Sequence, residues 1–373
     1  MPWTLKDIES EWLIPGEPLM FPADSIVDAF RVAEEIRGED WVRNCTYLPN
    51  GSRQLGYAAI LRVLWFAERA QVIYDGINSA HLIDRLRAGD VAADSELTGI
   101  HVLRSENRDT TLEIGPAVQV GSRVRKPDFR IAKQSAAWTH VEVTALHRSN
   151  ASQQVQAVLA KIADRVMSSP DSFVLEIVFS RIPNDEEIDA LVARAAQEIR
   201  SLEPRRVEFS DFAGLIFKAV ATATTVSPTP SEAIPVPMYA IARTFQGPDQ
   251  ATKQVLATMP FSDQRAEDVI NSEAQQLPKD TPGLIMVDVT AQPTALSSWE
   301  ALAVRRFTPT QHTRVGGIIL FMHATQPTAQ GLAWLPHVKL IRNPYARLPL
   351  PQWISETVDA TRTQMRSMTG RPD

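Results

Sequence analysis

Short apolar runs and helical stretches follow one another in a defined order after residue 94, and this order constrains the fold most. Residues 95–105 have helical spacing, and three segments rich in β-branched and apolar residues follow them. A helix at 151–167 and a short apolar strand at 172–180 come next. The three strand segments are expected at 110–120, 124–131 and 138–146, with a hairpin turn at Gly121-Ser122. The order helix, three strands, helix, strand predicts an α/β fold.

The flanking regions have their own patterns. Before residue 94 the apolar spacing is helical, and after residue 238 helices and strands alternate. A connection at 224–237, rich in Pro, Ser and Thr, indicates a surface loop or a boundary. We therefore expect an N-terminal helical region at 1–93, a core at 94–223 and a C-terminal α/β extension at 238–373. The expected helices are 23–38, 55–73, 79–89, 185–202, 265–277, 298–307 and one after Pro351, and the expected strands are 213–223, 236–244, 283–291, 315–322 and 338–341.

Composition excludes several classes of protein. A net charge of -6 argues against a protein that coats nucleic acid by bulk charge, so any such contact must be local. Cys45 is the only cysteine, which leaves no intrachain disulfide and no cysteine-rich zinc site. The chain has no secretory signal pattern at its start and no apolar run near the roughly 20 residues that span a bilayer. We expect a cytoplasmic protein with no membrane partner.

Asp128 and Glu142 are the residues that point to chemistry. Because side chains alternate along a strand, Glu142 shares one face of the segment 138–146 with His140 and Thr144. The other face is apolar and can pack under the following helix. A carboxylate that is buried in a central strand needs a compensating partner. A Mg²⁺ ion held by Asp128 and Glu142 would supply it.

At these residues the sequence resembles the PD-(D/E)XK, or restriction-endonuclease-like, superfamily, over about residues 94–180. Pro127-Asp128 and Glu142 fall on the two signature acidic positions, and Glu96 matches an acid that many members carry in the preceding helix. The resemblance implies a restriction-endonuclease-like α-β-β-β-α-β core. It also implies divalent-metal-dependent phosphodiester hydrolysis of nucleic acid, with Mg²⁺ (or Mn²⁺) held by Asp128, Glu142 and Glu96.

Thr144 occupies the position at which the family has a lysine. Threonine supplies no positive charge to the transition state, so a displaced cation is expected. Lys126 lies two residues before Asp128, on the same strand face, and Lys161 lies on the next helix, on the flank that also carries Gln154. We favour Lys161. If neither lysine reaches the site, the alternative is a catalytically inactive scaffold that binds protein or nucleic acid.

Basic residues concentrate between positions 123 and 133, where Asp128 is the single acid. Such a local concentration could neutralise phosphates beside a metal site. We expect DNA rather than RNA as the nucleic acid, with Gln154 as a further contact, and we leave a homodimer open. The basic residues are Arg123, Arg125, Lys126, Arg130 and Lys133.

Structural explanations stand beside the functional ones. Asp128 and Glu142 could form ion pairs with Arg125 or Arg148, and the basic run could be a solvated hairpin. Glu96 would be favoured in the first helical turn by the helix dipole alone. Glu113, on the strand before Asp128, is a rival for the first acid.

Overall fold

The chain forms two compact units in the computed structural model. Unit 1 comprises Met1–Leu146 and Arg265–Asp373, and unit 2 comprises His147–Gln264. The structure describes residues 3–13, 21–45, 57–134, 136–146, 157–158, 160–162, 164–165, 173–179, 183–201, 205–209, 213–218, 238–246, 252–260, 265–290, 295–328 and 331–369. These units differ from the three expected regions, because residues 94–146 belong with 265–373 and not with 147–223.

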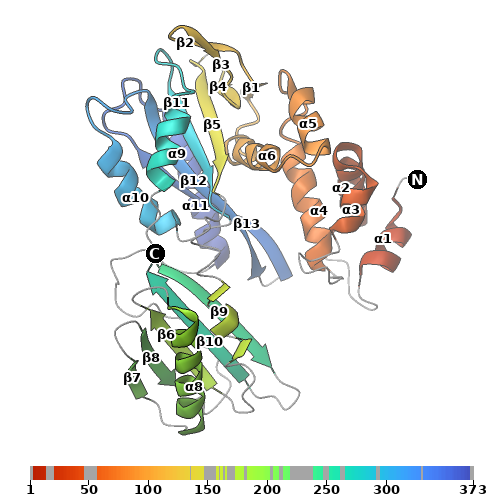
Figure 1. Ribbon diagram of the computed structural model, residues 1–373. Coiled ribbons are helices and arrows are strands. Elements are labelled where there is room, and N and C mark those ends of the chain that lie inside the picture. Colours follow the sequence, from red (N-terminus) through yellow and green to blue (C-terminus); the bar gives the residue numbers. More distant parts are fainter. Residues whose placement is uncertain are drawn as a thin grey trace. The chain divides into compact units, whose positions relative to one another are not determined.

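A six-stranded sheet of order β1-β4-β5-β11-β12-β13 forms the centre of unit 1 (Figure 1). β5, β11 and β12 are parallel to one another, and β1, β4 and β13 pair antiparallel with their neighbours. The sheet is therefore mixed, as expected for an α/β protein. The strands are β1 (Thr110–Ile114), β4 (Phe129–Lys133), β5 (Thr139–Ala145), β11 (Gly283–Asp288), β12 (Val315–Thr328) and β13 (Gly331–Arg342).

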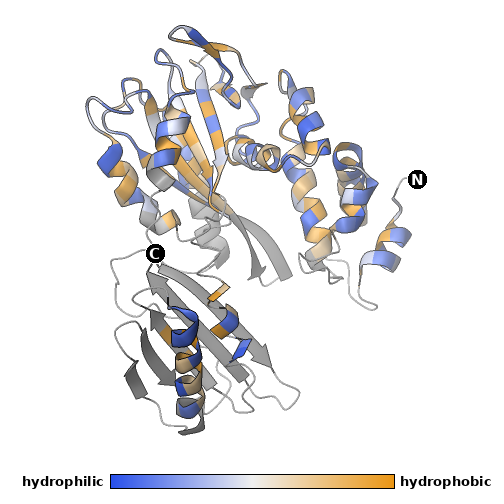
Figure 2. Ribbon diagram, in the orientation of Figure 1, coloured by the Kyte–Doolittle hydropathy of each residue, from blue (hydrophilic) through white to orange (hydrophobic). Residues whose placement is uncertain are grey.

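Helices cover both faces of this sheet. On one face, α9 (Arg265–Ala274) and α10 (Ala295–Arg306) pack on the apolar side chains of β11 and β12. On the other face lie α6 (Val91–Arg104) and α11 (Gln352–Thr369). A Cβ added at Gly99 would lie 3.3 Å from Cγ2 of Val143, so this glycine lets α6 approach β5 closely. Figure 2 shows hydrophobic residues concentrated in the central strands between these layers.

The N-terminal helices share one hydrophobic core with the sheet. Side chains such as Phe30 and Phe66 belong to the same buried cluster as Met286 and Phe321. The region 1–93 is consequently part of unit 1. Its helices are α1 (Leu5–Trp12), α2 (Ala23–Arg37), α3 (Glu39–Asn44), α4 (Tyr57–Ala70) and α5 (Ser79–Arg87). The expected helices at 23–38, 55–73 and 79–89 are confirmed, whereas α1 and α3 were not predicted.

Two expected strands are each split before a proline. The segment 110–120 divides into β1 and β2 (Val118–Val120) at Gly115-Pro116, and the segment 124–131 divides into β3 (Arg123–Arg125) and β4 at Lys126-Pro127. Proline lacks a backbone N–H and restricts the residue before it, which explains both breaks. β2 and β3 pair around Gly121, whose φ is 61°, and this confirms the predicted hairpin turn.

Unit 2 contains a separate five-stranded sheet of order β7-β8-β6-β10-β9. The strand expected at 172–180 forms as β6 (Phe173–Phe179), but it pairs with β8 and β10 and not with β5. α8 (Asp185–Ser201) begins with reciprocal hydrogen bonds between Asn184 and Glu187, as its start signal predicted. The other strands are β7 (Arg205–Phe209), β8 (Ala213–Lys218), β9 (Met238–Gln246) and β10 (Thr252–Pro260), of which β7 and β10 were not predicted.

The chain leaves unit 1 after β5 and returns to it with α9 and β11. β11 then pairs in parallel with β5, with Gly283 opposite His140. Within unit 1 the order α6, β1, β4, β5, α9, β11 is therefore helix, three strands, helix, strand. The second helix and the fourth strand of this order come from 265–288 instead of the expected 151–180.

Candidate functional site

Asp128 and Glu142 meet where β4 begins beside β5. Phe129 pairs with Val141, so continuing this register places Asp128 opposite Glu142. The Val143 N–H donates a 2.7 Å hydrogen bond to Oδ2 of Asp128, which fixes the carboxyl against β5. The Asp128 and Glu142 carboxyl groups also share a hydrogen bond. The predicted pair is thus brought together on neighbouring strands.

Glu96 joins this pair from α6. Its side chain is buried, and it shares a hydrogen bond with the Asp128 carboxyl. Nη1 of Arg85, on α5, donates a 2.6 Å hydrogen bond to Oε1 of Glu96, and its Nε lies 2.7 Å from Oδ2 of Asp90. We call Glu96, Asp128 and Glu142 the carboxyl cluster.

The cluster favours protonated carboxyl groups. Burial, followed by the charge of Asp128, raises the pKa of Glu142 to about 10 and that of Glu96 to about 8. Burial also raises the pKa of Asp128, against the opposing effect of the Val143 hydrogen bond. The pKa of Glu273, on α9, is raised by burial and by the charge of Asp128. Ionising all of these acids at once therefore requires an added cation.

The donor set suits a hard divalent cation. Oε1 of Glu142 is buried and has no hydrogen-bond partner within the described part of the chain. Carboxylate oxygens are the ligands that Mg²⁺ and Mn²⁺ prefer. Among the described residues, no group of three or more His, Cys, Asp or Glu has an arrangement that could hold a metal ion as it stands, so metal binding here would require the carboxyl groups to move.

The residues expected to compensate for the missing lysine have different surroundings. Thr144 is half-buried on β5, on the face of Glu142. Lys126 is exposed and precedes the proline that ends the strand, so it does not continue the strand face of Asp128. Lys161 is exposed in unit 2, with Nζ 3.8 Å from Oδ1 of Asp185. Gln154 lies outside the described residues.

The basic run from 123 to 133 divides into two groups. Arg123 is exposed and Arg125 half-buried on the β2–β3 hairpin, where they are available to solvent. Arg130 forms an ion pair with Glu113, with Nη2 2.5 Å from Oε2, and its guanidinium lies 4.4 Å from the Trp138 ring centroid. Nζ of Lys133 donates to Oδ1 of Asn107 at 3.0 Å. Arg130 and Lys133 thus have structural partners, and Glu113 is held by Arg130 on β1.

Arg85 and Glu273 were not predicted from the sequence patterns. Arg85 is the cation whose charge acts on both Glu96 and Asp128. Glu273 lies on the helix that precedes β11, far from Asp128 in sequence. An arginine on one amphipathic helix and a glutamate on another carry no local signal of a shared site. Arg85 reaches the cluster through the packing of α5 against α6, and Glu273 reaches it because β11, which follows α9, pairs with β5.

Glu142→Gln is expected to reduce the pH dependence of stability. Since the folded-state pKa values of Glu96 and Glu142 lie above the unfolded value near 4.3, their contribution to stability is complete below about pH 4 and is lost as pH rises through 8 and 10. At pH 9 the variant should be more stable than wild type by about 1–4 kcal/mol, or ~2–4 °C in Tm per kcal/mol. Thermal unfolding from pH 5 to 9 without divalent metal measures this.

The exposed Glu9→Gln variant is the control and should follow the wild-type profile. A wild-type melting temperature that stays constant or rises between pH 5 and 9 would contradict the buried, protonated cluster.

Comparisons with known proteins identify no relative of this chain. Neither the protein-family models, nor the curated proteins, nor the solved structures match this chain. Within the described residues, no helix has the length and apolar character needed to cross a membrane. The function is therefore inferred from the carboxyl cluster and the elements that hold it.

Proposed function

We propose that unit 1 catalyses divalent-metal-dependent hydrolysis of phosphodiester bonds in nucleic acid. The carboxyl cluster is the observation that carries this proposal. Three acids from α6, the start of β4 and β5 meet in a buried site, with pKa values raised by burial. Burying three carboxyl groups together lowers folding stability unless a cation balances their negative charge. Perturbed carboxyls of this kind are typical of functional sites.

The order of elements supports a restriction-endonuclease-like core. In this proposal α6, β1, β4, β5, α9 and β11 form the α-β-β-β-α-β unit, and unit 2 is an insertion between β5 and α9. The parallel pairing of β5 with β11 gives the fourth strand its expected neighbour. The acid on the first helix and the acids at the second and third strands then correspond to Glu96, Asp128 and Glu142.

Each residue has a distinct role in the proposed reaction. Asp128, Glu142 and Glu96 would hold Mg²⁺ or Mn²⁺, which when bound activates a water molecule and stabilises charge on the phosphate. Val143 orients Asp128 through its backbone N–H. Glu273 lies close enough to Asp128 to affect charge in the site, and it can accept a proton as the attacking water is deprotonated.

Arg85 is the cation that best compensates for Thr144. Its guanidinium hydrogen-bonds to Glu96, and its charge lowers the pKa of Asp128. It can thereby offset negative charge that develops at the phosphate. Lys126 and Lys161 remain candidates for phosphate contacts. DNA is the proposed substrate, with Arg123 and Arg125 of the exposed hairpin as backbone contacts.

A catalytically inactive scaffold is the second candidate function. Thr144 favours this scaffold, because it shares a strand face with Glu142 but supplies no positive charge for catalysis. The Arg85–Glu96 ion pair favours it too, since an acid that is neutralised by arginine has less need of a metal. Such a scaffold would bind protein or nucleic acid through the same unit.

A metal titration of variants tests the proposal. Mn²⁺ or Mg²⁺ should raise the Tm of the wild-type protein by mass action, and more strongly at pH 8 than at pH 6, because protons leave as metal binds. Glu96→Gln should reduce this shift, whereas Glu113→Gln should retain it because Glu113 pairs with Arg130. Cleavage of single- and double-stranded DNA and RNA is measured in parallel.

Three outcomes separate the candidates. Metal stabilisation together with cleavage supports the nuclease. An absence of both with every substrate favours the inactive scaffold. A loss of metal response in Glu113→Gln but not in Glu96→Gln would transfer the first acidic position to Glu113.

A further inference from the structure

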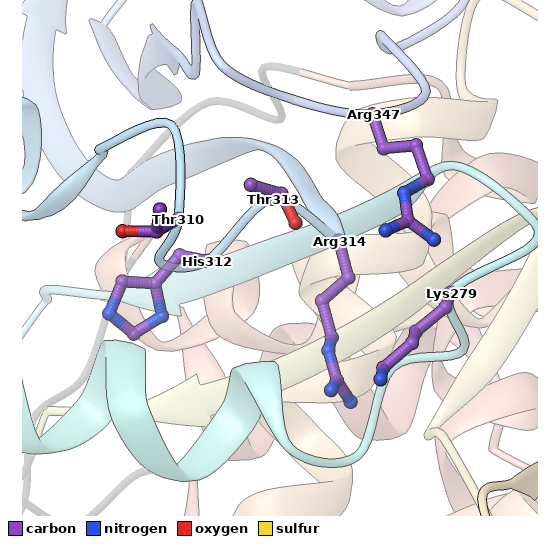
Figure 3. Close-up of a pocket in the computed structure, with 6 residues that line it drawn as sticks. All are labelled: Lys279, Thr310, His312, Thr313, Arg314 and Arg347. Carbon is purple, nitrogen blue, oxygen red and sulfur yellow. The ribbon is translucent and has the colours of Figure 1, made fainter.

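A second polar site lies in unit 1, at the edge of the sheet where β11 and β12 begin and β13 ends. It is a cavity of about 260 Å³, and no member of the carboxyl cluster lines it. The loop before β11, the loop between α10 and β12 and the segment after β13 contribute its walls. The lining residues are Lys279, Thr310, His312, Thr313, Arg314 and Arg347 (Figure 3).

Three cations converge on this cavity without an acidic partner. Figure 3 shows the ammonium of Lys279 beside the guanidinium of Arg314, with the guanidinium of Arg347 above them. No ion pair joins any of the three to a carboxylate in the part of the chain that the structure describes. Burial lowers the pKa of Arg314, which means that the protein does not fully offset the cost of removing this positive charge from water. A bound anion would supply that compensation.

Buried polar contacts hold the walls of the cavity in place. Asn343 is 5% exposed, and its Nδ2 donates to the carbonyl oxygens of His312 at 3.1 Å and Val315 at 2.8 Å. The Arg347 N–H donates to the Thr313 carbonyl at 2.7 Å, which joins the two loops. The cation-bearing loops are thus preorganised, which lowers the entropic cost of binding a ligand.

Close backbone packing fixes the position of Arg314. A Cβ at Gly283 would lie 2.6 Å from the Arg314 carbonyl oxygen, so only glycine fits there. Nη1 of Arg314 donates to the Leu277 carbonyl at 3.1 Å, which leaves its other guanidinium N–H groups for a ligand. The backbone of Arg314 is therefore held in place, and its remaining guanidinium N–H groups can donate hydrogen bonds to a ligand.

We propose that this cavity binds a phosphate group, either as free phosphate or as the terminal phosphate of a small ester. Planar guanidinium groups match the oxygens of phosphate, and lysine adds a point charge. The hydroxyls of Thr310 and Thr313 line the same cavity and can donate to further oxygens. A cavity of this volume suits a small ligand, whereas a polynucleotide requires an extended surface. The inference does not depend on the proposed nuclease activity.

Calorimetric titration of the full chain tests the proposal. The probes are inorganic phosphate, AMP, adenosine and an oligonucleotide without terminal phosphates. Phosphate or AMP should bind, and Lys279→Gln and Arg347→Gln should each weaken binding about tenfold or more. The control Lys6→Gln removes an exposed charge on α1 and should bind as wild type does. Tighter binding of AMP than of phosphate would identify an ester, and equal binding would identify free phosphate.

Several results would overturn the proposal. They are failure of both phosphate and AMP to bind, binding of the oligonucleotide alone, equal binding of adenosine and AMP, and equal affinity of the pocket variants and wild type. Circular dichroism of Lys279→Gln and Arg347→Gln confirms that both variants are folded. Metal-dependent cleavage should be retained in both, because neither residue contacts the carboxyl cluster.

Discussion

Asp128→Asn is expected to lower Mg²⁺-dependent cleavage by about a thousandfold, with little loss of folding stability. Asp128 is the acid that hydrogen-bonds with both Glu96 and Glu142, so it is central to the proposed ligand set. Asparagine has nearly the same shape, and its Oδ1 can still accept the Val143 N–H. The substitution removes charge while retaining this hydrogen bond. Initial rates on end-labelled duplex DNA, together with thermal unfolding, measure the two effects.

Asp24→Asn, which removes an exposed acid on α2, is the matched control and should cleave at the wild-type rate. Asp128→Asn should also lose the Tm increase that Mn²⁺ produces in the wild type. A folded Asp128→Asn variant that cleaves at the wild-type rate would eliminate the carboxyl cluster as the nuclease site.

Arg85→Gln is expected to reduce turnover by about a hundredfold to a thousandfold. Arg85 is the positive charge that acts on Glu96 and Asp128, and Thr144 offers no substitute. Because the arginine holds the pKa of Glu96 below the value that burial alone would give, its loss should also move the acidic limb of the pH–rate profile to higher pH. Thr144→Lys in the Arg85→Gln background should restore part of the rate. Single-turnover cleavage from pH 6 to 9 measures all three effects.

The control for this experiment is Arg87→Gln, on the same helix. Arg87 is exposed and pairs with Asp84, with its Nη1 3.3 Å from Oδ1. Its substitution should change neither the rate nor the pH profile. Wild-type turnover in Arg85→Gln combined with a loss in Lys126→Gln would assign the role of the displaced cation to Lys126.

Local sequence patterns were sufficient to predict most helices and strands and to single out Asp128 and Glu142. Helical spacing predicted α2, α4, α5 and α6, since burial of one helix face repeats every few residues along the chain. Alternation along β5 placed Glu142 on its polar face. Asp128 lies near it because β4 and β5 are successive in the sheet and pair antiparallel, whereas the Gly121 turn joins β2 to β3. Glu96 followed from its position in the preceding helix, as the resemblance implied.

The tertiary structure alone decided which strand lies beside β5. β6 and β11 are both short apolar runs that follow a helix, and periodicity cannot distinguish them. Burial of β11 between α6 and α9 gives it the place beside β5, while β6 pairs within the other unit. The same choice brings Glu273 to the carboxyl cluster.

The sequence by itself therefore determined the local elements and the meeting of Asp128 with Glu142, because neighbouring segments interact through repeating, short-range patterns. The tertiary structure decided that Arg85 and Glu273 act on the same acids, and that Lys279, Arg314 and Arg347 surround one cavity. These contacts join residues distant in the chain. They depend on which apolar faces pack against one another. Because the hydrophobic effect is not directional, an apolar face in the sequence does not specify the face that it will pack against.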